Sequence, residues 1–447
     1  MKTKLFGTDG VRGRAGAPPL DTRTIRRLGA ALVKALPAGS AAPHLLVGRD
    51  TRESGEWIER ELALGARSAG ATMTSAGVIS TPAIAFLTSR HGFAAGLVIS
   101  ASHNPFEDNG IKVFSGAGEK FTETLEAQVE AIVADASWAE PGGEAPEVPL
   151  VDLLDSYVRH VREALNGQFP TGARRIAVDC ANGATSGLAP RLLRELGFDV
   201  TAMGCEPDGR NINLACGSTH PDALARLVTA RGCALGVAFD GDGDRAIFVD
   251  SNGCVVDGDA VLYLCARQLK ERGALRGNAV VATVMSNIGL EIALRELGIR
   301  MVRCPVGDKY VMEELLRDNL ALGGEQSGHI IFADSLYTGD GLVTALNVLR
   351  VMAETGHSLD ALAGGLTTYP QVLLNVRVRE KRDWTTLPAV ATAAAAVEQR
   401  LAGNGRLLVR YSGTEPLLRV MIEGQHQAEI QSWAEEIVHA VKAEIGA

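Results

Sequence analysis

The chain has 447 residues, of which 46% are hydrophobic and 22% are charged, and its formal net charge is −9. This balance is typical of a globular protein and excludes a disordered or fibrous chain, while the length predicts three or four domains of about 100 to 150 residues each. The negative net charge disfavours nonspecific binding to nucleic acid, although arginines can still gather at a site for an anionic substrate.

The apolar runs are shorter than the roughly 20 residues that cross a bilayer, and the first ten residues contain no apolar signal core. We therefore expect a cytoplasmic protein without a membrane partner. The seven cysteines form no Cys-x-x-Cys pair, which predicts reduced and mostly buried thiols.

In chain order, apolar runs of strand length alternate with stretches of helical period, which predicts α/β units. Helices are predicted at residues 22–36 (with Asp21 as the cap), 57–68, 289–297 and 341–355. Strands are predicted at residues 45–48, 96–100, 175–179, 235–239, 279–284 and 407–410.

Composition breaks divide the chain. Residues 139–149 are rich in Pro, Gly and Glu and read as a linker, and a second break lies at residues 364–370. A weaker boundary falls near Ser251, where a hairpin turn inside one domain is the alternative. The predicted domains are residues 1–150, 151–252, 253–366 and 367–447.

The first loop with chemical potential is Ile99-Ser-Ala-Ser-His-Asn-Pro105, which follows an apolar strand. Open α/β sheets bind ligands at such strand ends, and Ser102 could present a nucleophilic hydroxyl beside the His103 imidazole. Taken alone, the loop is better explained as a polar turn that caps a strand. The absence of Gly-x-Ser-x-Gly around Ser102 argues against a serine hydrolase.

The second loop, Phe239-Asp-Gly-Asp-Gly-Asp-Arg245, places three carboxylates between two apolar flanks. Three such groups repel one another unless a cation compensates them, and oxygen ligands suit magnesium. The alternatives are a solvated acidic turn and a calcium EF-hand. The EF-hand pattern requires Gly at its sixth position and Glu at its twelfth, which are Arg245 and Ser251 here.

Two further loops carry weaker signals. Gly323-Gly-Glu-Gln-Ser-Gly-His329 could approach a polyhydroxylated ligand, although by itself it is better explained as a tight glycine turn with a structurally bonded histidine. Arg410-Tyr-Ser-Gly-Thr-Glu-Pro-Leu-Leu-Arg419 offers hydroxyls, backbone amides and two guanidiniums to a phosphate, although it could be an ordinary hairpin loop.

One assembly accounts for all four loops: a hydroxyl that carries a phosphoryl group, a metal, a sugar contact and a distal phosphate clamp. In this order and with these residues, together with Phe6-Gly-Thr-Asp-Gly-Val-Arg-Gly13, the set resembles the α-D-phosphohexomutase family from Phe6 to Arg419. The resemblance implies four domains around a central cleft, three related α/β domains with mixed sheets and a smaller α+β C-terminal domain. Details of the motifs favour glucosamine phosphate over glucose or mannose phosphates.

The resemblance also implies the site residues. Ser102 corresponds to the phosphorylated serine, which binds Mg²⁺ together with Asp240, Asp242 and Asp244. Glu325 and Ser327 correspond to the sugar contacts. The phosphate loop corresponds to Arg410, Ser412, Gly413, Thr414 and Arg419. The residues expected around the transferring phosphoryl group are Arg12, Lys112, His103, Arg245 and His329.

The catalytic hypothesis is an isomerase reaction through glucosamine 1,6-bisphosphate, in a cytoplasmic homodimer that feeds UDP-N-acetylglucosamine and peptidoglycan precursor synthesis. Lys112 is the first choice for general base or acid, because crowding by other cations would lower its pKa. Two rivals remain: a phosphomannomutase or phosphoglucomutase of the same family, and a noncatalytic sugar-phosphate sensor.

Overall fold

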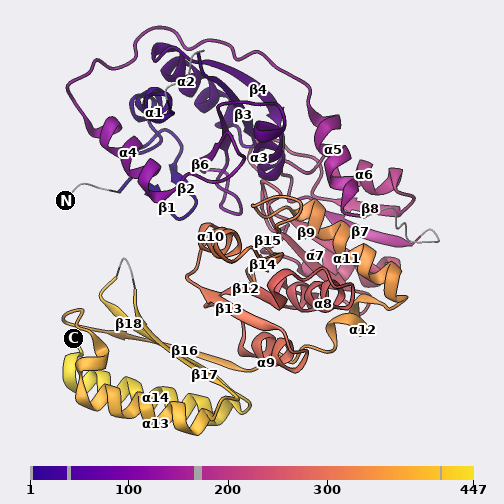
Figure 1. Cartoon of the computed structure of the whole chain (residues 1–447), viewed down its shortest axis with the longest axis vertical. Helices are drawn as coiled ribbons and strands as arrows, with labels where there is room; N and C mark the ends of the chain where they lie inside the picture. Colours follow the sequence, from indigo (N-terminus) through magenta and orange to yellow (C-terminus); the bar gives the residue numbers. More distant parts are fainter. Residues whose placement is uncertain (1–3, 38–41, 166–173, 413–414) are drawn as a thin grey trace. The chain divides into compact units, whose positions relative to one another are not determined.

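The computed structural model describes residues 4–37, 42–165, 174–412 and 415–447, which form two compact units. Unit 1 comprises Met1–Met285 and Met301–Gly364, and unit 2 comprises Ser286–Arg300 and Gly365–Ala447. Unit 1 contains three mixed sheets with helices packed on them, and unit 2 is built on a separate three-stranded sheet (Figure 1).

The first sheet has the order β1-β2-β6-β5-β3-β4. Its strands are β1 (Phe6–Gly7), β2 (Gly10–Arg14), β3 (His44–Arg49), β4 (Thr72–Val78), β5 (Ala95–Ile99) and β6 (Asp108–Ser115). Its helices are α1 (Thr22–Ala35), α2 (Gly55–Ser68), α3 (Thr81–Arg90) and α4 (Glu123–Ala134). The central strand β3 is parallel to both β4 and β5, whereas β6 is antiparallel to β5.

The α1–α2 pair shows why small residues occur in these helices. A Cβ atom on Gly29 would lie 2.3 Å from the Leu62 carbonyl oxygen, and one on Gly65 would lie 2.1 Å from that of Arg26. The two helices therefore approach so closely that neither position accepts a side chain. The Asp21 carboxylate caps α1 by accepting from the Thr24 backbone N–H at 3.1 Å, as the sequence predicts.

The second sheet has the order β11-β10-β9-β7-β8. Its strands are β7 (Arg175–Asp179), β8 (Asp199–Met203), β9 (Leu235–Phe239), β10 (Ala246–Asp250) and β11 (Val255–Val256), and the helices of this part of the chain are α5 (Leu154–Glu163), α6 (Ala189–Glu195) and α7 (Asp222–Arg231). β7 is parallel to β8 and β9, while β10 is antiparallel to β9. Ser251 lies in the turn of the β10–β11 hairpin.

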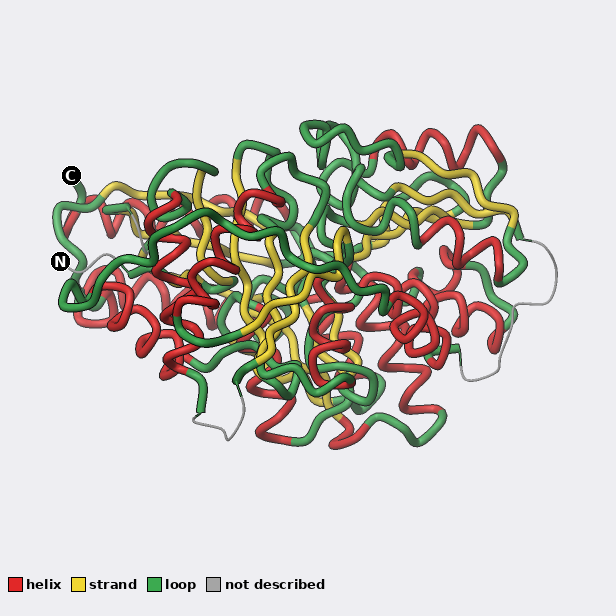
Figure 2. The backbone as a smooth tube through the Cα atoms, turned by 90° about the horizontal axis from the view of Figure 1, so that it is seen from above, coloured by secondary structure: helices red, strands yellow, loops and turns green. Residues whose placement is uncertain are grey.

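The third sheet has the order β13-β12-β14-β15. Its strands are β12 (Ala279–Thr283), β13 (Arg300–Cys304), β14 (Leu322–Gly324) and β15 (Ile330–Phe332). The helical segments of this part of the chain are α8 (Gly258–Glu271), η1 (Arg276–Asn278), α10 (Asp308–Asp318), α11 (Gly341–Thr355) and α12 (Leu359–Ala363). β14 is parallel to β12 and antiparallel to β15. Figure 2 shows the strands of the chain in yellow and the helices in red.

The three sheets share one arrangement. In each of them a central strand (β3, β7 or β12) pairs in parallel with a strand (β5, β9 or β14) that is followed by an antiparallel partner (β6, β10 or β15). The loop before that antiparallel partner contains Ser102 in the first sheet, the Asp cluster in the second and Glu325 in the third. Three of the four loops singled out in the sequence thus occupy equivalent positions in a repeated fold.

Unit 2 packs its helices on an antiparallel sheet of order β16-β18-β17. Its elements are α9 (Ile288–Glu296), β16 (Gln371–Arg377), η2 (Trp384–Thr386), α13 (Pro388–Leu401), β17 (Arg406–Tyr411), β18 (Leu417–Glu423) and α14 (Gln427–Ile445). Helix α14 buries Ile430, Ala434, Ile437, Val441 and Ile445. Their spacing of three or four residues is that of one helical face.

Two sequence expectations are tested by the described residues. None of their helices combines the length and the apolar character that a bilayer crossing requires. All seven cysteines are free thiols, and five of them are buried, while Cys205 is half-buried and Cys254 is exposed.

Candidate active site

Ser102 lies at the end of β5 in a strained backbone conformation. Its φ is +53°, in the left-handed region that costs an L-residue roughly 1–2 kcal/mol. The side chain is fully buried, and the backbone N–H donates to Ser100 Oγ at 2.9 Å. Such strain persists only where the surroundings fix the backbone, and it is a feature of functional sites.

Arg52 and Asn213 fix this loop from outside it. The buried Arg52 guanidinium pairs with Asp50 at 2.9 Å and donates to the carbonyl oxygens of Ser102 at 3.0 Å and Asn104 at 2.9 Å. Asn213 Nδ2 donates to the same two oxygens at 2.9 and 3.0 Å. The loop is therefore held from two directions before any ligand binds.

The Ser102 loop also contacts the Asp loop directly, at Gly241. A Cβ atom on Gly241 would lie 2.6 Å from the Ser102 carbonyl oxygen and 2.8 Å from Ile212 Cδ1. Gly241→Ala is expected to cost about 1–3 kcal/mol of stability and to lower turnover, because the two loops must separate. Gly187→Ala is the matched control, since its added Cβ would meet nothing within 4 Å. Equal melting temperatures and turnover in both variants would contradict this prediction.

The Asp loop brings its three carboxylates together behind Ser102. One ligand oxygen each from Asp240, Asp242 and Asp244 lies within 4.8 Å of the others, and all three side chains are buried. Ser102 Oγ donates to Asp240 Oδ2 at 2.6 Å. Burial and repulsion by Asp244 and Asp242 raise the pKa of Asp240 well above its ordinary value.

The donor set fits a magnesium ion. Among the described residues, Asp242 Oδ1 and Asp244 Oδ1 are buried and accept no hydrogen bond. Unsatisfied carboxylate oxygens beside a carboxyl group with a raised pKa are the environment that a hard divalent cation stabilises. Ser102 Oγ adjoins the same cluster, so a phosphoryl group on this oxygen would share the cation.

Lys112 lies on β6, and its neighbours are carboxylates rather than the cations that the sequence analysis expects. Its Nζ contacts Asp242 at 2.8 Å, Asp244 at 2.9 Å and Asp9 at 3.0 Å. Burial alone would lower the pKa of Lys112, but these carboxylates outweigh it and raise the pKa well above the ordinary value. The expectation of a lowered pKa through crowding by cations is therefore wrong, and Lys112 holds its proton firmly.

His103 and Arg245 lie next to Ser102 on the side of the cavity. His103 Nδ1 is 3.4 Å from Ser102 Oγ and 3.2 Å from Arg245 Nη1. Burial, Arg245 and Arg12 lower the pKa of His103 to about 4. Its imidazole is therefore neutral at neutral pH, while Arg245 supplies the positive charge.

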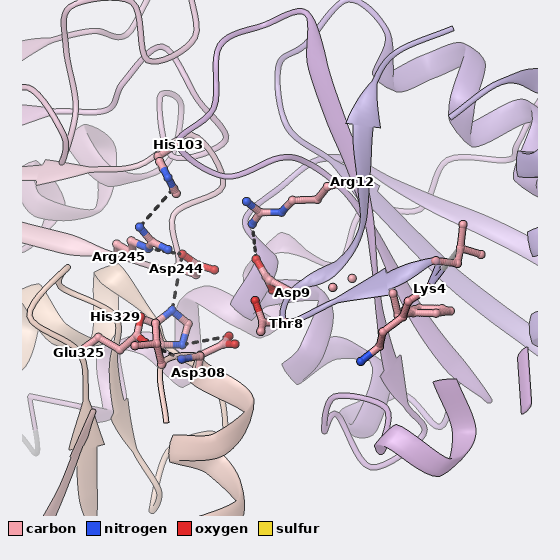
Figure 3. Close-up of a pocket in the computed structure, with 16 residues that line it drawn as sticks. Lys4, Thr8, Asp9, Arg12, His103, Asp244, Arg245, Asp308, Glu325 and His329 are labelled. Carbon is pink, nitrogen blue, oxygen red and sulfur yellow. Dashed lines mark hydrogen bonds and ion pairs between the residues drawn. The ribbon is translucent and has the colours of Figure 1, made fainter. Parts of the chain in front are cut away.

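A cavity of about 580 Å³ opens in front of these groups, and Figure 3 shows the side chains that line it. Arg12 reaches it from β2 and pairs with Asp9, while His329 reaches it from the loop before β15. His329 Nε2 accepts from the Gly339 N–H at 2.9 Å, and its Nδ1 lies 3.7 Å from Asp244 Oδ1. Charges from all three sheets of unit 1 therefore meet in this cavity.

The sugar-contact loop joins this cavity to a second one of about 410 Å³. Glu325 and Arg245 line both cavities, and Ser327 lines the second. Glu325 Oε1 accepts from the Gly307 N–H at 3.1 Å, and Ser327 Oγ donates to Glu325 Oε2 at 3.2 Å. The carboxylate is thus held in place between the two spaces.

The fourth loop lies in unit 2. Arg410 and Arg419 are cross-strand partners in the β17–β18 pair, so their side chains lie on the same face of the sheet. Ser412 is buried, and its Oγ accepts from the Glu415 N–H at 3.3 Å. Gly413 and Thr414, predicted as phosphate contacts, lie outside the described residues.

A buried carboxyl behind the site gives a pH prediction. Asp340 caps α11 by accepting from the Val343 N–H at 3.0 Å, and it accepts from the Tyr157 hydroxyl at 2.8 Å. Burial raises its pKa to about 6. Because the unfolded carboxyl titrates near pH 4, ionisation of Asp340 removes about 3 kcal/mol of stability as the pH rises to 6.

Asp340→Asn cannot ionise. Its Oδ1 still accepts from the Val343 N–H, and its Nδ2 donates to the Tyr157 hydroxyl, which accepts in place of donating. The variant should therefore gain stability relative to the parent between pH 4 and 6, and the difference should stay constant above that range. Urea midpoints of both proteins at pH 4.5, 6 and 7.5 measure this change. A stability difference that does not vary with pH would contradict it.

Sequence reasoning missed several residues that the fold brings to the site. Asp50 and Arg52 directly follow strand β3, so the strand-end rule that selected Ser102 could have selected them also. Asp9 lies inside the Phe6–Gly13 motif but was assigned no role. Asn213 and Asp308 carry no local signal, because their contacts depend on chain segments far away in the sequence.

A buried hydroxyl beside three converging carboxylates, with lysine and arginine side chains around it, defines the class of the protein as a phosphoryl-transfer enzyme. The chain belongs to the phosphoglucomutase/phosphomannomutase family. Family models match α/β/α domain I at residues 3–140, domain II at 155–253, domain III at 257–369 and the C-terminal domain at 373–440.

Curated relatives are similar over their whole length. The phosphoglucosamine mutase of Solibacter usitatus is 50% identical and is covered over 100% of both chains, and that of Koribacter versatilis is 48% identical over 99% of this chain and 97% of the relative. Among solved structures, a phosphoglucomutase/phosphomannomutase family protein from Burkholderia thailandensis has a TM-score of 0.81 at 25% identity, with 100% of both chains covered. An N-acetylphosphoglucosamine mutase from Aspergillus fumigatus shares the fold, with a TM-score of 0.67 at 18% identity over 98% of this chain and 95% of that one.

Proposed function

We propose that this enzyme is a phosphoglucosamine mutase, an isomerase that interconverts glucosamine 6-phosphate and glucosamine 1-phosphate. The observation that carries the proposal is the 2.6 Å contact between Ser102 Oγ and Asp240 in a buried cluster of three carboxylates. The full-length similarity to phosphoglucosamine mutases supports the choice of sugar.

In the proposed cycle, phosphorylated Ser102 transfers its phosphoryl group to O1 of glucosamine 6-phosphate. The bond between phosphorus and Ser102 Oγ breaks, a bond to O1 forms, and the O1 proton passes to Ser102 Oγ, which gives glucosamine 1,6-bisphosphate and a free serine hydroxyl. After the intermediate turns around, its 6-phosphoryl group returns to Ser102 and glucosamine 1-phosphate leaves. The strained, doubly held Ser102 loop fixes the attacking and leaving oxygen in one position throughout.

The buried charges take electrostatic roles in this proposal. Asp240, Asp242, Asp244 and the Ser102 phosphate would hold Mg²⁺, which neutralises charge on the transferring group when bound. Arg12 and Arg245 contribute guanidiniums to the phosphoryl oxygens. Lys112, with its raised pKa, serves as a fixed positive charge rather than as a general base. His103 and His329 border the same phosphoryl position.

Sugar and distal phosphate contacts complete the proposed site. We assign the ring hydroxyls of the sugar to Glu325, which lines both cavities, and to Ser327, which lines the second. We assign the non-reacting phosphate to Arg410, Ser412, Gly413, Thr414 and Arg419. The paired guanidiniums on one face of the β17–β18 pair support this assignment.

The wider context follows from the proposed reaction. The enzyme would act in the cytoplasm as a homodimer and supply glucosamine 1-phosphate for UDP-N-acetylglucosamine and peptidoglycan precursors. We also keep the division into domains at residues 1–150, 151–252, 253–366 and 367–447 as part of the proposal.

A coupled assay for glucosamine 1-phosphate, run with and without Mg²⁺, tests the function. We expect turnover that requires Mg²⁺ and exceeds that of glucose or mannose 1-phosphate at equal concentration. Comparable turnover of the mannose or glucose substrate would favour the phosphomannomutase or phosphoglucomutase alternative. Binding of the sugar phosphate without any turnover would favour the sensor.

A further inference from the structure

Lys120 bridges two carboxylates that come from different parts of unit 1. It lies between β6 and α4, and its side chain is only 9% exposed. Its Nζ contacts Asp9 Oδ1 at 2.5 Å and also donates to Asp308 Oδ2. Asp9 belongs to the β1–β2 turn of the first sheet, whereas Asp308 is the first residue of α10 beside the third sheet.

Each of these carboxylates also contacts a basic side chain of the candidate active site. Asp9 Oδ2 lies 3.0 Å from Lys112 Nζ and pairs with Arg12. Asp308 Oδ2 lies 3.4 Å from His329 Nε2. Both carboxylates line the 580 Å³ cavity, so Lys120 acts on that cavity through them.

The contacts close into a ring in which acidic and basic groups alternate. Lys112 contacts Asp244 at 2.9 Å, and His329 Nδ1 lies 3.7 Å from the same carboxylate. The ring therefore runs through Lys120, Asp9, Lys112, Asp244, His329 and Asp308, and returns to Lys120. Figure 3 labels Asp9 and Asp308 among the side chains that line this cavity.

Lys120 is the group that lets the two carboxylates stay close. Both oxygens bond the same nitrogen, so they lie within about 5 Å of each other in a buried place. Without the ammonium they would repel each other, because burial weakens the screening of their charges by water. Separation would move Asp9 away from Arg12 and Lys112, and Asp308 away from His329.

We propose that Lys120 is a positioning residue for phosphoryl transfer, which holds Asp9 and Asp308 so that Arg12, Lys112 and His329 face the phosphoryl group. The inference rests on the proposed mutase function and adds a residue outside the four loops. Burial alone would lower the pKa of Lys120, but Asp308 and Asp9 outweigh it and raise the pKa, so the side chain stays charged at neutral pH.

The test compares Lys120→Met with Lys309→Met in the full-length enzyme. Lys309 provides a matched control, because its Nζ also forms a buried ion pair between α10 and the first-sheet part, with Glu126 on α4 at 2.8 Å. We expect Lys120→Met to lower kcat about 100-fold with KM within threefold, and Lys120→Arg to retain at least a fifth of kcat. Lys309→Met should keep kcat within threefold of the parent.

A double variant separates positioning from general structural damage. Asp308→Asn in the Lys120→Met background removes one of the two repelling charges, so kcat should recover at least tenfold and the melting temperature should rise. This double variant keeps the test decisive if Lys120→Met alone is unstable. Equal losses in Lys120→Met and Lys309→Met, or no recovery in the double variant, would overturn the proposal. An inactive parent enzyme would instead refute the mutase function itself.

Discussion

Replacing Ser102 by alanine is expected to lower kcat by about 10³-fold or more, because the substitution removes the protein oxygen that carries the phosphoryl group in the proposed cycle. Nearby hydroxyls do not substitute for it in this geometry: Ser100 Oγ, for example, donates to Asp50 at 2.6 Å and accepts from the Ser102 N–H. Mass spectrometry after incubation with glucosamine 1,6-bisphosphate should detect one labile phosphate on the parent protein and none on Ser102→Ala.

The loss of activity in Ser102→Ala should come from the missing phosphoryl carrier rather than from a change in folding. Alanine keeps the Cβ atom and the same backbone conformation, while Ser102→Gly also relieves the positive φ and should be about 1 kcal/mol more stable than Ser102→Ala. Both variants should be equally inactive. Ser68→Ala, which removes a hydroxyl at the end of α2, serves as the control and should retain full activity. Undiminished turnover in Ser102→Ala would exclude the phosphoserine mechanism.

Asp240→Asn should also lower turnover strongly, while it should raise the stability of the metal-free protein. It removes a charged ligand from the predicted magnesium site, so kcat at saturating Mg²⁺ should fall about 10²-fold or more. The melting temperature of the parent should rise on adding Mg²⁺, because a ligand of the native state stabilises it. The rise should be much smaller in the variant.

The stability of the metal-free protein should fall as the pH rises. The pKa of Asp240 is raised in the folded state, so the native protein keeps a proton that the unfolded chain loses from about pH 4 upward. Stability of the parent therefore falls as the pH rises through this window, whereas asparagine does not ionise. In EDTA at pH 7.5, Asp240→Asn should melt above the parent.

The control for this experiment is Asp222→Asn, an exposed carboxylate in the first turn of α7. Its melting temperature should respond to Mg²⁺ and to pH as the parent does. A parent protein that gains no stability from Mg²⁺, or an Asp240→Asn variant that melts below the parent in EDTA, would contradict the metal assignment.

Local sequence was enough for some of the elements and for the choice of the candidate site loops. The strands at residues 175–179 and 235–239 and the helix at 341–355 have the predicted bounds, because their apolar runs and caps are properties of contiguous residues. Ser102 and the Asp triad could be identified for the same reason. Their chemistry depends on residue types crowded into a few positions at a strand end.

The tertiary structure alone decided which charges meet. It placed the loops of Ser102, Asp240 and Glu325 at equivalent positions of three sheets, a repeat that the sequence does not display. It surrounded Lys112 with Asp9, Asp242 and Asp244 and so reversed the expected direction of its pKa shift. Burial and Coulomb interactions depend on distance through space, and the segments that supply these neighbours lie more than a hundred residues apart in the chain.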